Sequence, residues 1–359
     1  MQDMKEFFAE LMRPPVRKIE PYDAAPLPGA KILLSANENN AGVPEGVLSA
    51  MTAALKRGNR YPDSRNSGLR EKLASRFGLE PGQIITSNGL DGMFTMLARA
   101  FMDERDDVVC GECTFGVYAS NAEIAGAKTV KVPLSPSFRQ EPMRFAESVT
   151  PATKMLFFCN PNNPTGCLAA EDEIREMLEA VPRRVIVVLD EAYTEFSGTD
   201  GKRSFGLLRD FPNLIICRTF SKIFALAGLR VGWAAAHPDL LDCLFRVREP
   251  YCVTSVAEAG AAAALDETEF LKSVYETTVN EREKLCRVIG ECGIPFLPSR
   301  ANFILMLPGE KTDALKEAFR EKAIAARYLK CAGRPAIRIS IGLPEENAEA
   351  AKAMRLCCR

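Results

Sequence analysis

The sequence is poor in histidine, with His237 as the only one among 359 residues. A nucleophilic triad needs a histidine as its general base, and His237 precedes Pro238 in a segment typical of a loop. The Cys-x-x-Cys pattern from Cys110 to Cys113 lacks the second pair of ligands, or the histidines, that a zinc site requires. The composition therefore argues against a histidine-based triad and against a metal site.

The sequence also lacks an excess of charge of either sign and any long apolar run. Lys and Arg number 46 and Asp and Glu number 47, so no basic field favours nucleic acid or an anionic membrane. No apolar run reaches the length of a membrane span. Residues 1–15 are too mixed in charge for a signal peptide, and they predict a short amphipathic helix that stops at Pro14. We expect neither nucleic acid nor membrane as a partner.

Cysteine, by contrast, is plentiful, with 12 residues. A chain of this length can bury enough apolar surface without disulfides, so the cysteines do not indicate a small secreted scaffold. Most cysteines are expected to be small residues of the core. We expect the protein itself to lie in the reducing cytoplasm.

Short apolar runs alternate with helical patterns between residues 84 and 235. This alternation predicts an α/β fold with a mostly parallel sheet and helices on both faces. Ligands of such sheets bind at the carboxyl ends of the strands. Expected strands are 84–86, 107–110, 128–132, 154–159, 184–189, 214–219 and 231–235, with helices at 92–101, 121–125 and 171–180.

The pattern changes near residue 250, and the change predicts a second domain. Helices are expected at 257–265, 270–289 and 313–323, with strands at 301–307 and 336–341. We therefore expect a large domain over residues 42–250. Residues 1–41 and 251–359 are expected to form an N-terminal arm and a small α+β domain.

The most informative segment is RTFSKIFALAGLRVGW at 218–233. Ser221 and Lys222 follow an apolar run, and Arg230 lies eight residues beyond the lysine. A lysine amine can form a Schiff base with a carbonyl, while a hydroxyl and a guanidinium can hold a phosphate. The segment predicts a site for a phosphorylated carbonyl cofactor.

Two further segments offer partners for a charged aromatic ring, CNPNNPTG at 159–166 and LDEAYTEF at 189–196. Asp190 ends an apolar strand, where a carboxylate without a partner would be costly. Two unit charges about 4 Å apart interact by roughly 4 kcal/mol at an effective dielectric of 20, or about three pKa units, enough to keep a pyridine nitrogen protonated. Asn163 and Tyr193 can both bond a phenolate oxygen.

Two segments upstream add candidate contacts. In TSNGLDGMF at 86–94, Gly89 turns the chain into a helix, whose first amides at Leu90 and Asp91 can bind phosphate. In CTFGVY at 113–118, Phe115 follows a strand and is either a stacking partner for a planar ring or a core aromatic.

Together these motifs resemble the fold-type-I aminotransferases that use pyridoxal 5′-phosphate, and within them the histidinol-phosphate aminotransferase family. The resemblance covers nearly the whole chain. It includes further short matches, which are PY at 21–22, SANEN at 35–39, RYPD at 60–63, ANFIL at 301–305, RY at 327–328 and IRISIG at 337–342.

The resemblance implies a role for each candidate residue. Lys222 would bind the cofactor aldehyde and act as the general base, and Asp190 would pair with the ring nitrogen. Tyr193 and Asn163 would hold the ring oxygen, with Phe115 stacked on the ring. The phosphate would be held by Ser221, Arg230, Thr219, the amides of Leu90 and Asp91, and Tyr61 of a partner subunit.

That role for Tyr61 implies a homodimer with shared active sites. Tyr22, Arg327 and Arg338 would face the anionic end of the substrate. Gly92, Asn40–Ala41 and Cys113 depart from the family pattern, and these departures bear on the substrate rather than on the cofactor.

The implied reaction converts L-histidinol phosphate and 2-oxoglutarate to imidazole acetol phosphate and L-glutamate, a step of histidine biosynthesis. An aromatic amino-acid aminotransferase and a threonine-phosphate decarboxylase are alternatives. A regulator that senses the cofactor would need an added basic DNA-binding domain, for which the segment before residue 84 leaves no room.

Overall fold

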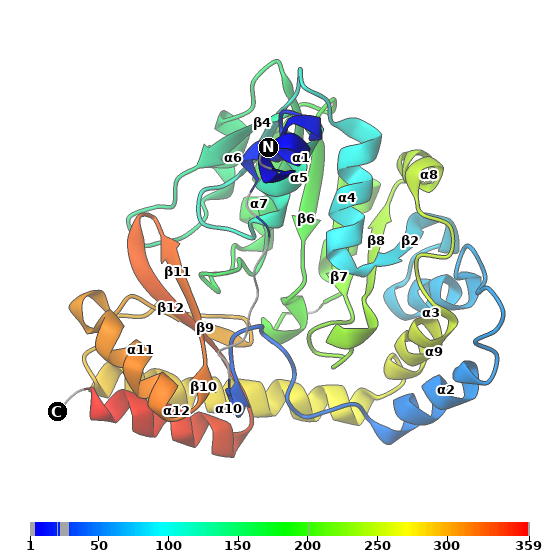
Figure 1. Cartoon of the computed structure of the whole chain (residues 1–359). Coiled ribbons are helices and arrows are strands. Elements are labelled where there is room, and N and C mark those ends of the chain that lie inside the picture. Colours follow the sequence, from blue (N-terminus) through cyan, green and yellow to red (C-terminus); the bar gives the residue numbers. More distant parts are fainter. Residues whose placement is uncertain (1–3, 20, 22–28, 200, 358–359) are drawn as a thin grey trace.

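The computed structural model describes residues 4–19, 21, 29–199 and 201–357. At its centre lies a seven-stranded sheet in the order β2-β8-β7-β6-β5-β3-β4, flanked by helices (Figure 1). Strand β8 is antiparallel to both of its neighbours, and all other pairs are parallel. This confirms the predicted α/β fold. The strands are β2 (Ile84–Asn88), β3 (Asp107–Gly111), β4 (Lys128–Val132), β5 (Thr153–Cys159), β6 (Ile186–Asp190), β7 (Leu214–Thr219) and β8 (Val231–Ala236).

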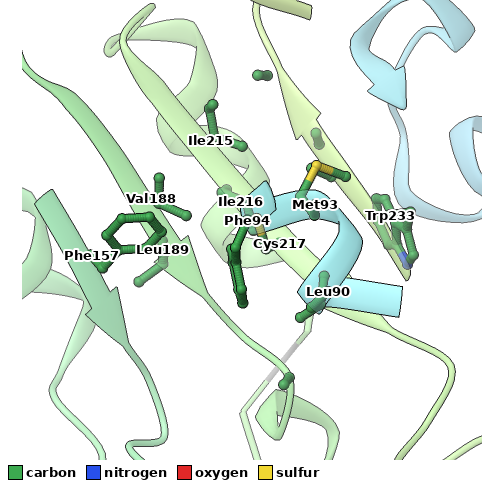
Figure 2. Packing of buried hydrophobic residues seen from close by; sticks show 14 of the residues in the cluster. Leu90, Met93, Phe94, Phe157, Val188, Leu189, Ile215, Ile216, Cys217 and Trp233 are labelled. Carbon is green, nitrogen blue, oxygen red and sulfur yellow. The ribbon is translucent and has the colours of Figure 1, made fainter. Parts of the chain in front are cut away.

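Strands β6 and β7 form the centre of the sheet and are buried along their whole length. They are apolar up to Asp190 in β6 and up to Arg218 and Thr219 in β7, because a central strand is covered on both faces. Figure 2 shows Leu90, Met93 and Phe94 of helix α4 beside the apolar side chains of these strands. The helices of this part are α2 (Glu45–Leu55), α3 (Ser67–Phe77), α4 (Gly89–Phe101), α5 (Val117–Ala125), α6 (Pro142–Glu147), α7 (Glu171–Ala180), α8 (Pro238–Val247) and α9 (Ser255–Ala264).

A second hydrophobic cluster lies beneath a three-stranded antiparallel sheet in the order β11-β12-β9. The long helix α10 runs along the base of the molecule from the α9 side to this cluster (Figure 1). The segment 32–33 pairs with 324–325, so the N-terminal arm joins the second cluster. Its elements are β1 (Ile32–Leu33), α10 (Thr268–Glu291), β9 (Phe303–Met306), α11 (Thr312–Glu321), β10 (Ile324–Ala325), β11 (Arg327–Cys331), β12 (Arg334–Ser340) and α12 (Pro344–Leu356).

The division into domains stays a prediction. Helix α9 follows residue 250, yet it packs against α2 and α3 and contributes Ala257 and Ala261 to the larger cluster. The short N-terminal helix α1 (Met4–Leu11) ends before Pro14, as the sequence predicts. Within the described ranges no helix is long and apolar enough to cross a membrane.

One cysteine pair differs from the expectation of separate core residues. Cys113, in the loop after β3, forms a disulfide with Cys331 at the end of β11, with a Cα–Cα distance of 5.5 Å. Cys110, Cys159 and Cys217 are buried thiols in the strands, as expected. Cys113 is therefore not half of a local Cys-x-x-Cys pair. In the part of the chain that the structure describes, no cluster of His, Cys, Asp or Glu could hold a metal ion.

Candidate active site

The carboxyl ends of β5, β6 and β7 place Asn163, Asp190 and Lys222 at the same edge of the sheet. Lys222 Nζ donates to Ala36 O at 3.2 Å and lies 5.6 Å from the centre of the Tyr193 ring. Burial lowers the pKa of Lys222 from 10.5 to about 8, and the positive charge of Arg338 adds to the effect. At about pH 7 roughly a tenth of the lysine is therefore neutral and nucleophilic, far more than of an ordinary lysine.

Asp190 is the last residue of β6 and is only 3% exposed. The hydroxyl of Tyr118 donates to its Oδ2 at 2.5 Å, and the amide of Ala192 donates to its Oδ1 at 3.0 Å. Burial raises the pKa of Asp190 to about 6, and these two hydrogen bonds oppose that rise. The carboxylate is thus buried and oriented, and an additional cationic partner would stabilise its charged form.

Tyr193 and Asn163 are both held by neighbours that leave a donor available. Asn37 Nδ2 donates to the hydroxyl oxygen of Tyr193 at 3.0 Å, and Arg338 Nη1 donates to Asn163 Oδ1 at 2.5 Å. Because both residues accept these bonds through oxygen, each keeps a hydrogen that it can donate. Burial raises the pKa of Tyr193 well above its usual value, so the hydroxyl stays protonated. The pair can donate to one anionic oxygen.

An anion cradle lies at the N-terminus of α4. Gly89 begins the helix at a φ of 67°, a conformation that glycine adopts without strain. The guanidinium of Arg230 lies over Gly89, where a Cβ atom would collide with it, and its Nη1 donates to Ser221 Oγ at 3.3 Å. The backbone amide of Ser221 donates to Thr219 Oγ1 at 3.0 Å. A cavity of about 350 Å³ borders the cradle at Asp91 and Arg230 and extends along α4 to Arg99 and Glu249.

The chemistry of this cradle suits a phosphate. Free amides at the start of a 13-residue helix, a hydroxyl and a guanidinium all donate hydrogen bonds to anions. Asp91 Oδ2 accepts from Arg230 Nη2 at 3.2 Å, which holds the guanidinium at the mouth of the cradle.

Phe115 is half-buried and meets the Tyr118 ring edge-on at 5.7 Å between centroids. It also packs against the large hydrophobic cluster. Its stacking role stays a prediction.

Two of the three residues predicted to bind the substrate's anionic end are neighbours in the structure. Arg327 and Arg338 are directly opposite each other in the β11–β12 pair. Arg338 is buried and also donates to Ser35 O at 2.7 Å, so it is fixed between the N-terminal arm and Asn163. Tyr22 lies outside the described residues.

Tyr61 is 81% exposed and stacks on Tyr251 with 4.5 Å between ring centroids. Such a stacked and exposed aromatic pair is available to another surface.

Sequence reasoning missed Tyr118 and Asn37, two buried residues that bond directly to candidate site residues. Asn37 has a φ of 55°, its amide donates to Ser340 Oγ, and its carbonyl accepts from Asn302 Nδ2. It therefore connects Tyr193 with residues of the second part of the chain. The segment SANEN contained Asn37 only as a family match, and CTFGVY contained Tyr118 but indicated Phe115 alone.

Comparison with known proteins gives one consistent result. A family described as aminotransferase class I and II matches residues 30–354. The chain is 38% identical over 334 residues to histidinol-phosphate aminotransferase 2 of Ralstonia nicotianae, covering 91% of this chain and 89% of that protein. It is 34% identical to histidinol-phosphate aminotransferase 1 of Idiomarina loihiensis, covering 98% and 99%.

Solved structures agree. The crystal structure of histidinol-phosphate aminotransferase from Sinorhizobium meliloti in complex with pyridoxal 5′-phosphate superposes with a TM-score of 0.90 at 26% identity, covering 97% of both chains. An aspartate aminotransferase mutant of Thermus thermophilus superposes with a TM-score of 0.80 at 22% identity, covering 96% of this chain and 99% of that one, and supports the fold alone.

Proposed function

This chain belongs to the aminotransferase class I and II family, and on that premise we propose that it transfers the amino group of L-histidinol phosphate to 2-oxoglutarate with pyridoxal 5′-phosphate as cofactor. The products would be imidazole acetol phosphate and L-glutamate, as in histidine biosynthesis. The observation that carries the proposal is the meeting of a lysine with a depressed pKa, a buried aspartate and an anion cradle at one sheet edge. Relatives at 34–38% identity with histidinol-phosphate aminotransferase names support the donor.

The residues present fit this cofactor. The cradle at Gly89 and Arg230 would hold its phosphate, together with Ser221, Thr219 and the amides of Leu90 and Asp91. When bound, the cofactor supplies an aldehyde that takes up the amino group and a cationic ring that withdraws electrons.

Lys222 has two tasks in this proposal. Its neutral amine would bind the aldehyde. Once the donor amine has released it, the same Nζ would take the proton from the donor Cα and hold it as an ammonium until the proton is returned. The pKa of about 8 suits both tasks, since the base is neutral often enough to accept a proton and basic enough to take it.

Asp190, Tyr193 and Asn163 orient the ring and fix its charge. The buried carboxylate of Asp190 would pair with the ring nitrogen and keep a proton on it. Tyr193 and Asn163 would donate to the ring oxygen with the hydrogens that Asn37 and Arg338 leave available. Phe115 would cover one ring face, and its half-buried position beside Tyr118, which donates to Asp190, supports this role.

Arg327 and Arg338 are proposed to hold the anionic end of the substrate, with Tyr22 as a further contact. Their opposite positions in β11 and β12 support a site that takes one anion between two guanidinium groups. The same arginines would also grip a carboxylate, which keeps an aromatic amino-acid aminotransferase as the second candidate.

We also propose a cytoplasmic homodimer in which Tyr61 of one protomer contacts the cofactor phosphate of its partner. The exposure of the Tyr61–Tyr251 stack supports this role. Residues 42–250 are proposed as the cofactor-binding domain, and residues 1–41 with 251–359 as the arm and small domain.

One donor screen tests the function. The purified enzyme, loaded with pyridoxal 5′-phosphate, is assayed for L-glutamate formation from 2-oxoglutarate with L-histidinol phosphate, phenylalanine, tyrosine or threonine phosphate. We expect the highest kcat/KM with L-histidinol phosphate. A preference for phenylalanine or tyrosine would replace the proposal by the aromatic aminotransferase, and carbon dioxide release from threonine phosphate would indicate the decarboxylase.

A further inference from the structure

Tyr118 is a fully buried tyrosine whose hydroxyl points at the carboxylate of Asp190. It belongs to α5, and its ring lies parallel to Phe157 with 4.7 Å between centroids. The ring of Phe94 meets it edge-on at 5.0 Å. Because Phe157 and Phe94 pack against the Tyr118 ring, they fix its orientation and therefore the direction of its hydroxyl.

We propose that Tyr118 is a positioning residue that keeps Asp190 ionised and aimed at the ring nitrogen of the cofactor. The proposal rests on the proposed function for the identity of that ring. It gives Asp190 a partner within the protein, in addition to the ring nitrogen that the family motifs imply.

The direction of the bond follows from protonation. Burial and the nearby negative charge of Asp190 raise the pKa of Tyr118 well above its usual value, so the hydroxyl is the donor and the carboxylate is the acceptor. A hydrogen bond donated to the charged form of an acid favours that form. The Ala192 amide does the same at the other carboxylate oxygen.

The other titratable groups near Asp190 do not lower its pKa. Cys159 and Cys217 on the neighbouring strands are neutral thiols whose pKa burial raises, and Tyr193 is likewise protonated. Glu191 and Asp91 carry negative charge and raise the pKa of Asp190 further. Tyr118 and the Ala192 amide are thus what opposes the effect of burial.

The size of the effect on the pKa of Asp190 follows from the strength of this hydrogen bond. A hydrogen bond to a charged group shifts a pKa by about one to two units. Because the pKa of Asp190 is about 6 with Tyr118 in place, losing the bond would bring it to neutrality or above. The apoenzyme would then present a largely protonated carboxyl to the cofactor at about pH 7.

The test compares Tyr118→Phe with the parent enzyme, and with Tyr275→Phe as a matched control that removes a hydroxyl from a tyrosine packed against the same cluster. The pKa of Asp190 is read in the apoenzyme by carboxyl ¹³C NMR, with Asp190→Asn to assign the signal. We expect a rise of about one to two units in Tyr118→Phe and none in the control.

Cofactor affinity supplies the second readout. Tyr118→Phe should raise the Kd for pyridoxal 5′-phosphate about tenfold or more near pH 7, and the difference should shrink near pH 9, where Asp190 is ionised in both proteins. In the Asp190→Asn background, Tyr118→Phe should add no further loss. A merely structural role would weaken binding equally at every pH and in both backgrounds.

Two outcomes would overturn the proposal, an unchanged pKa of Asp190 and an affinity loss that does not depend on pH. If Tyr118→Phe does not fold, a fluorinated tyrosine at position 118 replaces it. As a stronger donor of similar shape, it should lower the pKa of Asp190, and an unchanged pKa would again refute the role. The apoenzyme measurement needs no cofactor, so a parent chain that fails to bind pyridoxal 5′-phosphate refutes the proposed function separately.

Discussion

The rate at which Lys222 captures the cofactor should depend on pH in a way that an ordinary lysine would not show. Only the neutral amine attacks an aldehyde. Burial brings the pKa of Lys222 to about 8. At about pH 7.5 roughly a quarter of such an amine is neutral, against about one part in a thousand for an ordinary lysine, a gain of about 200-fold.

The measurement is stopped-flow mixing of apoenzyme with pyridoxal 5′-phosphate between about pH 6 and 10, followed by absorbance. The rate of the covalent step should rise about tenfold per pH unit at low pH and level off above a midpoint near 8. Because the folded-state pKa is depressed, the neutral form gains as pH rises through 8 rather than through 10.5.

Two variants test whether the absorbance change comes from Lys222. Lys222→Ala should abolish both the absorbance change and the adduct that borohydride fixes, while Lys128→Ala, which removes an exposed lysine, should leave the profile unchanged. A rate that still rises tenfold per unit between about pH 8.5 and 10 would refute the depressed pKa. An adduct that persists in Lys222→Ala would refute the assignment of the lysine.

Asp190→Asn should keep the fold but lower turnover by about two to three orders of magnitude, because a charge pair of roughly 4 kcal/mol is lost, and near-normal turnover would contradict its role. Gly89→Ala should raise the Kd for pyridoxal 5′-phosphate in fluorescence titration, because a Cβ would collide with the guanidinium of Arg230 at a φ of 67°; unchanged affinity would exclude the cradle. Arg327→Ala should lower kcat/KM for L-histidinol phosphate by about one to two decades and hurt phenylalanine far less, while equal losses would favour the aromatic aminotransferase. Tyr61→Phe should weaken cofactor binding, and light scattering should show that the enzyme is a dimer. A monomer with full activity would exclude the shared site.

The residues that could be predicted from the sequence are those that follow an apolar strand directly. Asp190 and Lys222 each come within a few positions of a buried run, so the end of the strand places them at the sheet edge without further information. Arg230 was found through its distance from the lysine in the same segment. These local signals were sufficient for the fold, while the site that they outline stays a prediction.

Residues that act across the fold could not be predicted in this way. Tyr118 reaches Asp190 from a helix 72 positions away, and nothing in the pattern around it indicates that contact. Strand β11 was missed because its side chains alternate between partly buried and exposed over only five residues. The pairing of Cys113 with Cys331 spans 218 positions, and only the fold brings the two together.

That disulfide turns most of the polypeptide into a covalent ring. Asp190, Lys222 and Arg230 lie inside the ring, whereas Gly89 and Arg338 lie on the two tails that leave it. A protease that cuts once anywhere between Cys113 and Cys331 opens the ring but separates nothing, because both new ends stay attached through the sulfur bridge. On a gel, the nicked chain would run as two fragments only after a thiol reductant is added.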